Sequence, residues 1–292
     1  MTTTPSEKTG ITLMLGSVVA FAANALLIRG LSLAVPAADG WVASLFRGVV
    51  GLLVVALFFW RKGFQPRHLF THPLLIVRGL LGGFGILALY ITVVKLGAGR
   101  AVIINLSYPI FGCLFASIWL GETLPARSWA WMIAGFAGLL VFLGGGIEMA
   151  IGKYDLLALA GAIAAGGVIT LIRQLRHTEN TATIYASQCL ASVLFTVGPA
   201  AGPSISLPAG PFLLMTLAAA LVAIAQLAMT HAYRTLSVAR GSSIQMLLPL
   251  VTAIGGWAIF HETFTLLEAA GAGLTLLATW RVIAAPKTKA AT

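Results

Sequence analysis

Apolar runs of membrane-spanning length fill most of this chain. A transmembrane helix needs about 20 consecutive, mostly apolar residues. Ten such runs can be drawn, at 11–33, 39–60, 73–96, 99–121, 127–146, 154–172, 181–200, 209–230, 238–260 and 265–284. Only 9% of the 292 residues are charged, whereas a soluble domain carries about a quarter. The sequence therefore predicts an all-α, polytopic membrane protein with ten transmembrane helices and no room for a soluble catalytic domain.

The positive charges are distributed unevenly between the loops. The net charge of +10 would suggest a nucleic-acid partner in a soluble protein, but here it is better explained by membrane topology. If the N-terminus is cytoplasmic, three cations face outward: Lys95, Arg100 and Lys153. Twelve face inward: Lys8, Arg61, Lys62, Arg67, Arg127, Arg173, Arg176, Arg234, Arg240, Arg281, Lys287 and Lys289. We therefore predict a multi-pass protein of the cell (inner) membrane with both termini cytoplasmic and no nucleic-acid partner.

An internal repeat divides the chain into two halves. At a shift of 140 residues Pro109 falls on Pro249 and Glu122 falls on Glu262, without a gap between them. Each half holds five predicted helices, and because five is odd the halves must cross the membrane in opposite directions. This is the inverted-repeat organisation of secondary transporters. We expect the first repeat at residues 1–148 and the second, inverted repeat at 149–292.

Each half carries an amide side chain four residues before a proline inside an apolar run. Asn105 precedes Pro109, and Gln245 precedes Pro249. Because proline has no N–H group, it frees the carbonyl four residues earlier, and an unpaired polar group must face protein, water or a ligand at membrane depth. Broken helices at matching places in two halves indicate a central binding site. The alternative is that the prolines only bend the helices and the amides bond neighbouring helices.

Glu122 and Glu262 each follow an apolar run and precede a threonine that can cap the next helix. Under the inverted topology they lie at opposite membrane faces. We interpret both as interface anchors or gate-closing charges rather than as substrate ligands.

The arrangement resembles the EamA family of the drug/metabolite transporter superfamily. The resemblance covers nearly the whole chain and is carried by LYITVVKLGAGRAVIINLSYPIFGCLFASIWLGET and HAYRTLSVARGSSIQMLLPLVTAIGGWAIFHET. The second half departs from the family's Gly-Glu pattern, because His261 stands where the first half has Gly121. The resemblance implies transport of small metabolites through a central cavity between the halves. Within this family the chain is similar to the aromatic amino-acid exporters. This similarity favours amino acids as the substrate.

Several polar side chains inside the predicted helices are candidates for that cavity. Arg47 lies about a third of the way into its helix, where an unpaired charge is costly, so it either clamps a substrate carboxylate or bonds helix ends or Asp39. Arg29 and Arg78 lie nearer to helix ends and are expected to snorkel. The predicted substrate-binding set is Asn24, Arg47, Tyr90, Asn105, Gln226 and Gln245. Each amide could instead tie helices together.

The acidic residues bear on energy coupling and on the class of function. All eight lie in tails, loops or helix ends (Glu7, Asp39, Glu122, Glu148, Asp155, Glu179, Glu262 and Glu268), so no carboxylate is available at membrane depth for proton coupling. No nucleophile–base pair, metal-ligand set or cofactor motif is present, which argues against an intramembrane enzyme. We predict a secondary transporter, an exporter or facilitator of small organic metabolites that works by alternating access. A monomer is compatible with the sequence, which leaves the oligomeric state open. Multidrug efflux or uptake of another metabolite is the alternative, and a structural membrane protein is disfavoured.

Overall fold

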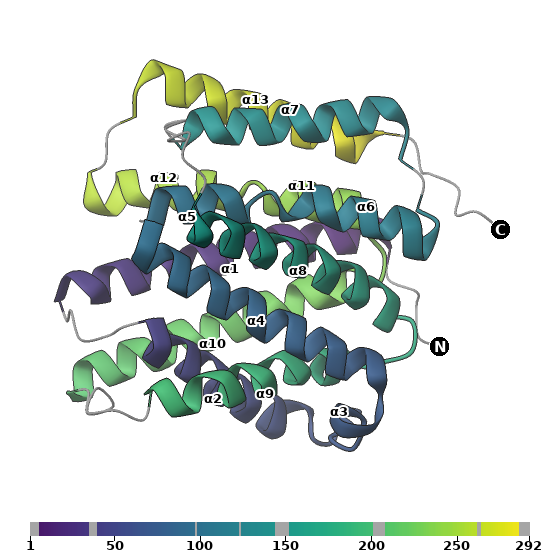
Figure 1. Cartoon of the computed structure of the whole chain (residues 1–292), viewed down its shortest axis with the longest axis vertical. Coiled ribbons are helices and arrows are strands. Elements are labelled where there is room, and N and C mark those ends of the chain that lie inside the picture. The colour runs from purple at the N-terminus through teal and green to yellow at the C-terminus, as the bar shows by residue number, and fades with distance from the viewer. Residues whose placement is uncertain are drawn as a thin grey trace.

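The structure is a computed structural model, and it is helical throughout the residues that it describes (Figure 1). These are residues 6–34, 40–96, 98–122, 124–143, 152–200, 208–261 and 264–285. The first half contains α1 (Glu7–Ala34), α2 (Gly40–Phe59), α3 (His68–Thr71), α4 (Pro73–Leu96), α5 (Ala98–Asn105), α6 (Tyr108–Leu120) and α7 (Ala126–Phe142). The second half contains α8 (Lys153–Leu175), α9 (Thr181–Ala200), α10 (Ala209–Ala232), α11 (Val238–Gln245), α12 (Leu248–Phe260) and α13 (Leu266–Ala284).

By length and composition, seven helical stretches of the described chain could cross a membrane. They are Glu7–Ile28, Trp41–Phe59, Lys153–Leu175, Thr181–Ala200, Ala209–Ala232, Val238–Ile259 and Leu266–Ala284. Three shorter apolar helices accompany them: Pro73–Leu89, Tyr108–Leu120 and Ala126–Phe142. The all-helical, multi-pass character predicted from the sequence is confirmed, but ten full-length spans are not.

Both runs that contain the matched prolines are interrupted at corresponding places. α5 ends at Asn105 and α11 ends at Gln245, and each proline is the second residue of the helix that follows. The interruptions share one geometry, with φ −74° and ψ −9° at Ser107 and φ −76° and ψ −12° at Leu247. Proline tolerates the first turn of a helix because the N–H it lacks has no partner there. Each predicted span is therefore a pair of short helices.

The contacts between the two halves recur when the corresponding helices of the halves are exchanged. α1 packs on α10 as α4 packs on α8, α10 packs on α2 as α4 packs on α9, and α1 packs on α12 as α6 packs on α8. α2 pairs with α9 and α7 pairs with α13, the latter pair running side by side along one edge of the bundle (Figure 1). Such pairing is what two inverted repeats would produce. The division at residues 148 and 149 lies outside the described part of the chain.

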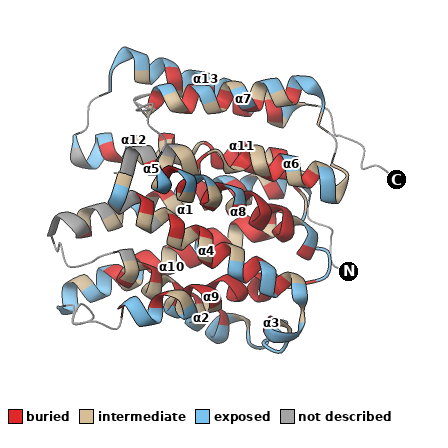
Figure 2. Cartoon of the chain, viewed as in Figure 1, coloured by how far each residue is buried: buried red, intermediate tan, exposed pale blue. Residues whose placement is uncertain are grey.

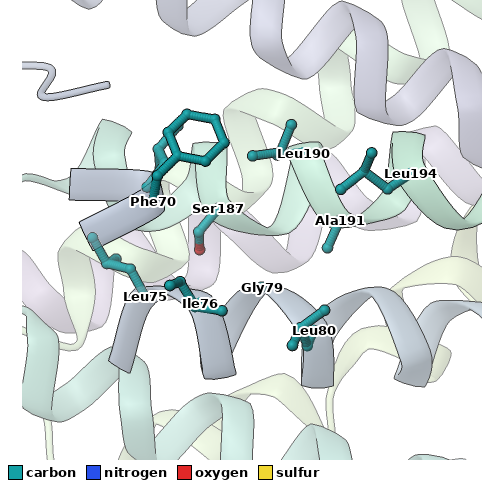
Figure 3. A pocket seen from close by; sticks show the side chains of 10 residues that line it. Phe70, Leu75, Ile76, Gly79, Leu80, Ser187, Leu190, Ala191 and Leu194 are labelled. Carbon is teal, nitrogen blue, oxygen red and sulfur yellow. The ribbon is translucent and has the colours of Figure 1, made fainter. Parts of the chain in front are cut away.

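Glycines allow close contact between α4 and α9. A Cβ added at Gly79 would lie 2.6 Å from the Ser187 carbonyl oxygen, and one at Gly83 would lie 2.7 Å from the Phe195 ring. Figure 3 shows Gly79 facing Ser187 in a mostly apolar crevice of about 190 Å³ between these helices, where the Ser187 hydroxyl donates to the Ile184 carbonyl of its own helix. Small residues of this kind let helix backbones approach within a bilayer. The crevice has no polar group suited to orienting a metabolite, and several of its side chains, such as Leu194, are exposed.

The burial pattern separates an interior from an apolar exterior. Figure 2 shows buried residues concentrated on α8, α9 and α10 and along the inward faces of α1 and α4. Large apolar side chains are exposed around the outside, including Leu57 at 77% and Leu266 at 89%. An exterior this apolar suits contact with lipid rather than with water.

Candidate functional site: a cavity between the two halves

A cavity of about 270 Å³ lies at the centre of the bundle. Its wall draws on α1, α2, α4, α5, α6, α8, α9, α10, α11 and α12, so both halves contribute. Neither α7 nor α13 contributes a lining residue. The lining is mostly apolar, with a few polar groups: Arg47, Asn105, Tyr108, Gln188, Gln226 and Gln245. A concave, mainly apolar site with a small number of polar groups is typical of small-molecule binding.

Four of the six residues predicted to bind substrate meet in this cavity. Arg47 comes from α2 and Asn105 ends α5, whereas Gln226 lies on α10 and Gln245 ends α11. The two glutamines are buried, with 4% and 3% exposure, and Arg47 and Asn105 are half-buried. Residues separated by up to about 200 positions therefore converge on one space, two from each half.

The buried glutamines are held by their neighbours. The Gln226 side chain donates from Nε2 to Oε1 of Gln188 over 2.8 Å. The Gln245 amide donates to the Ser17 hydroxyl over 3.3 Å and lies 3.1 Å from the Met14 sulfur. These bonds tie α10 to α9 and α11 to α1. Each amide is thus positioned by the protein while its remaining hydrogen-bonding capacity is available on the cavity side.

Arg47 and Asn105 differ from the glutamines. Neither side chain has a hydrogen-bond or ion-pair partner among the residues that the structure describes, and Asp39, the partner considered for Arg47, lies outside them. A guanidinium carries five N–H donors and an amide carries both donors and an acceptor, so both residues can bind a polar ligand. These are the groups of the wall best suited to bind substrate directly.

Asn24 lies apart from the central cavity. It lines a small space of about 30 Å³ between α1, α2 and α10, which it shares with Arg47. Its Nδ2 donates to the Ala218 carbonyl over 2.9 Å, so this amide ties α1 to α10. Asn24 was predicted to bind substrate, but its side chain does not line the main cavity. The Tyr90 side chain lies outside the described part of the chain.

The two helix interruptions form part of the cavity wall. Asn105 and Tyr108 line it on either side of the first interruption, and Gln245 and Leu248 do so at the second. Pro109 is buried and Pro249 is half-buried directly behind them. Because neither proline has an N–H to donate, the carbonyls of Asn105 and Gln245 lose their regular helical partner at the wall.

Glu122 joins four helix ends on the side of the bundle that holds Glu7 and Ala285, which we call the basic end. Its Oε1 accepts from Nε of Arg173 over 3.1 Å, and its Oε2 accepts from the backbone N–H of Val238 over 2.9 Å. Arg173 in turn donates to the carbonyls of Tyr233 and Arg234, each over 2.9 Å. Glu122 therefore links α6 to the ends of α8 and α10 and to the first turn of α11, as expected of an anchor. Its counterpart Glu262 lies outside the described residues.

The basic end is closed by apolar packing as well as by polar contacts. A fully buried cluster fills the space between this end and the cavity, with Met14, Leu75, Ile172, Tyr233 and Leu236 among its members. Arg240 contacts both Glu7 and the Ala285 carbonyl, which brings the start of α1 and the end of α13 together. Burial, and then the nearby cations Arg173, Arg176 and Arg234, lowers the pKa of His177 below its usual value. The local potential at this end is therefore positive.

Three residues of the site were not predicted, and one expectation was wrong. Gln188 and Tyr108 line the cavity, as does the aromatic ring of Phe21. Tyr108 directly precedes Pro109, so its proximity to the helix interruption could have marked it as a cavity residue.

Arg78 was expected to snorkel to the membrane surface, but its side chain is entirely buried. The reason is that α4 lies against α9 closely enough to enclose it.

Curated proteins similar to this chain are transporters. The pseudopaline exporter of Pseudomonas aeruginosa is 25% identical over 174 residues, which cover 60% of this chain and 60% of that protein. The riboflavin transporter of Rhizobium johnstonii is 26% identical over 219 residues, covering 69% of this chain and 72% of that protein. The match thus spans 60% of the exporter's length, which is less than two thirds of it. A solved crystal structure matches with a TM-score of 0.79 over 95% of this chain and 96% of that one, at 18% identity, which shows a shared fold.

The family model matches both halves of the chain in turn. The model for the EamA-like transporter family covers residues 8–144 and again residues 152–284. Together the two segments account for most of the sequence, and both contribute to the cavity. The family and the similar curated proteins are transporters rather than enzymes. This multi-pass membrane protein belongs to the EamA-like transporter family.

Proposed function

We propose that this protein is a secondary transporter of small organic metabolites that carry a carboxylate, with amino acids as the favoured class, and that substrate binds in the central cavity. The observation that carries the proposal is the convergence of Arg47, Asn105, Gln226 and Gln245 on one space between the two halves. Arg47 and Asn105 have no partner within the described chain, so they are free to bind a ligand.

The wall supplies complementary groups for an amino acid. A guanidinium binds a carboxylate through two parallel hydrogen bonds, which gives Arg47 the role of a carboxylate clamp. The amides of Asn105 and Gln245 can bond the remaining polar groups of the substrate. Phe21, Tyr108 and Met229 offer an apolar surface on which a side chain or ring can pack. This division of the wall supports a substrate with a polar head and an apolar body.

We propose that transport is by alternating access, and the closure of one end of the cavity supports this. At the basic end, the Glu122–Arg173 ion pair and the buried cluster around Met14 separate the cavity from the exterior. We infer that these contacts part when that end opens, with repeats 1–148 and 149–292 moving against each other about the interrupted helices. The positive-inside rule supports a cytoplasmic location for the basic end, and we propose the cell (inner) membrane as the membrane that holds the protein.

Transport is proposed to follow the substrate gradient. The acidic residues that the structure describes lie at helix ends or between helices: Glu7, Glu122, Asp155, Glu179 and Glu268. None of these five sits beside the central cavity. A proton-coupled carrier usually keeps a carboxylate at membrane depth. An imposed pH difference should therefore leave the exchange rate nearly unchanged.

The test is exchange in liposomes that contain the purified protein. A panel of labelled amino acids, with riboflavin as a different metabolite, is supplied outside vesicles loaded with the same unlabelled compound, with and without a pH difference. Arg47→Ala should abolish exchange of a transported amino acid, whereas the matched control Arg127→Ala, at the exposed start of α7, should not. Unchanged transport by Arg47→Ala would contradict the proposal that Arg47 binds the substrate carboxylate. Failure of the whole panel to exchange would contradict the proposed substrate class.

A further inference from the structure

Arg78 is a buried cation with no carboxylate partner among the residues that the structure describes. Its side chain on α4 has 0% exposure and is the largest fully buried side chain described. None of its three guanidinium nitrogens has a hydrogen-bond partner in the described structure. Within the described part of the chain, its ionisable neighbours are Cys189, Tyr185 and Arg47, none of which is a carboxylate.

An isolated charge in this position needs an explanation. A guanidinium does not lose its proton in proteins, so burial cannot neutralise Arg78. Leaving one member of an ion pair buried without its partner is strongly destabilising. Even a complete buried ion pair can often be replaced by apolar side chains of similar volume without loss of stability, so an unpaired buried charge should be at least as replaceable. We therefore look for a role of Arg78 in function rather than in the stability of the protein without substrate.

The surroundings of Arg78 place it behind the cavity wall. The Tyr185 hydroxyl on α9 is also buried, beside the thiol of Cys189 on the same helix. A Cβ added at Gly51 of α2 would lie 2.6 Å from that hydroxyl and 2.5 Å from the Cys189 sulfur, so α2 and α9 meet here. Gly82, one helical turn beyond Arg78, lines the cavity. The Arg78 charge thus belongs to the interface of α2, α4 and α9 that continues into the wall.

Arg47 belongs to the same interface, one helical turn before Gly51, and lines the cavity directly. Two positive charges therefore act on this space, and the described lining contains no acidic side chain that could offset them or receive a substrate ammonium. In a low-dielectric interior a charge acts over several ångströms without contact.

We propose that the missing negative charge arrives with the substrate, so that the cavity selects organic compounds with a net negative charge over zwitterions and cations. Arg47 binds the acidic group directly, and Arg78 strengthens the attraction from behind the wall without contact. Arg78 is thus a specificity-determining residue. This inference rests on the proposed function and narrows its substrate class from carboxylate-bearing compounds in general to organic anions, acidic amino acids among them.

The first experiment measures thermal unfolding of Arg78→Met in detergent, with chloride as the main anion. Methionine keeps the length and apolar stem of the side chain and removes the charge. The variant should unfold at the same temperature as the wild-type protein or at a higher one. The control, Arg127→Met, should unfold with the wild type. A midpoint several degrees lower for Arg78→Met would show that Arg78 has structural partners and would overturn the proposal.

The second experiment measures binding of matched acid and amide probes, first to the wild-type protein. The pairs are glutamate with glutamine and benzoate with benzamide. The acid should bind at least about tenfold more tightly than the amide, the effect of a charge within about 10 Å at an effective dielectric constant of about 20. Arg78→Met should lower this ratio severalfold without abolishing it, because Arg47 still binds the acid, and Arg127→Met should keep the wild-type ratio. Equal binding of acid and amide by the wild-type protein, or binding of neither member of either pair, would overturn the proposal.

Measuring exchange of the same acids and amides across liposomes distinguishes failure of this inference from failure of the proposed function. If the acids bind selectively but do not exchange across liposomes, the transport proposal fails and the anion site stands. If acid and amide exchange at equal rates, transport stands and anion selectivity is refuted.

Discussion

His261 adopts a backbone conformation that its residue type disfavours. It ends α12 with φ 56° and ψ 35°, in the left-handed region, and its counterpart Gly121 ends α6 with φ 63° and ψ 18°. Glycine occupies this region without strain, whereas the Cβ of other residues meets the following carbonyl. The departure from the Gly-Glu pattern in the second half therefore changes the residue but not the geometry, and the strain falls on His261.

Relief of this strain is measurable at a single position. His261→Gly should raise the free energy of unfolding by about 1 kcal/mol, and Gly121→Ala should lower it by a similar amount. Chemical unfolding of both variants in the same detergent provides the measurement. A loss of stability in His261→Gly would show that the imidazole makes a contact worth more than the strain.

At the level of elements, close helix contact at α4 and α9 depends on Gly79. Gly79→Ala places a Cβ 2.6 Å from the Ser187 carbonyl oxygen, so the helices must separate, and a loss of about 1–3 kcal/mol is expected from overpacking. Gly273 on α13 is exposed and has no atom within 4 Å of an added Cβ. Gly273→Ala should therefore be neutral or gain up to about 1 kcal/mol in helix propensity. Equal effects of the two substitutions on chemical unfolding would contradict the proposed packing.

The helical elements were largely predictable because each depends on local sequence. Apolar runs of about 20 residues indicate membrane helices whatever surrounds them, and a proline preceded four residues earlier by an amide marks an interruption in each half. The break itself lies at Ser107 and Leu247, slightly before each proline, because proline is accommodated in the first turn of a new helix. The sequence could indicate that each apolar run is interrupted near its proline, but not the residue at which one short helix ends and the next begins.

The environment of individual polar residues was less predictable because it depends on contacts between distant helices. Asn24 and Gln226 are both amides in apolar helices, yet one bonds a backbone carbonyl and the other lines the cavity beside Gln188. Arg78 lies near the start of its helix, which favours snorkelling, and only the packing of α4 against α9 shows that it is enclosed. Periodicity and composition contain no information on such pairings.

At the scale of the whole molecule, the orientation in the membrane is the main prediction still to be tested. Gln65 lies in the exposed loop at the basic end, and Ala209 lies at the exposed start of α10, which the inverted topology places on the opposite side. Both native cysteines are buried, so single introduced thiols can be labelled selectively. In intact cells, a membrane-impermeant thiol reagent should label Ala209→Cys and leave Gln65→Cys unlabelled. The opposite labelling pattern would reverse the orientation.

The central claim is that substrate passes through the cavity between the two halves, and blocking that cavity tests it most directly. Ala165 on α8 lines the cavity and is half-buried, so the indole of Ala165→Trp would occupy the binding space. Ala270→Trp adds the same side chain to an exposed position on α13 and serves as the control. The measurement is substrate exchange in liposomes by variants that match the wild type in thermal unfolding. We expect Ala165→Trp to abolish exchange and Ala270→Trp to retain it. Full exchange by a folded Ala165→Trp protein would mean that substrate takes another path.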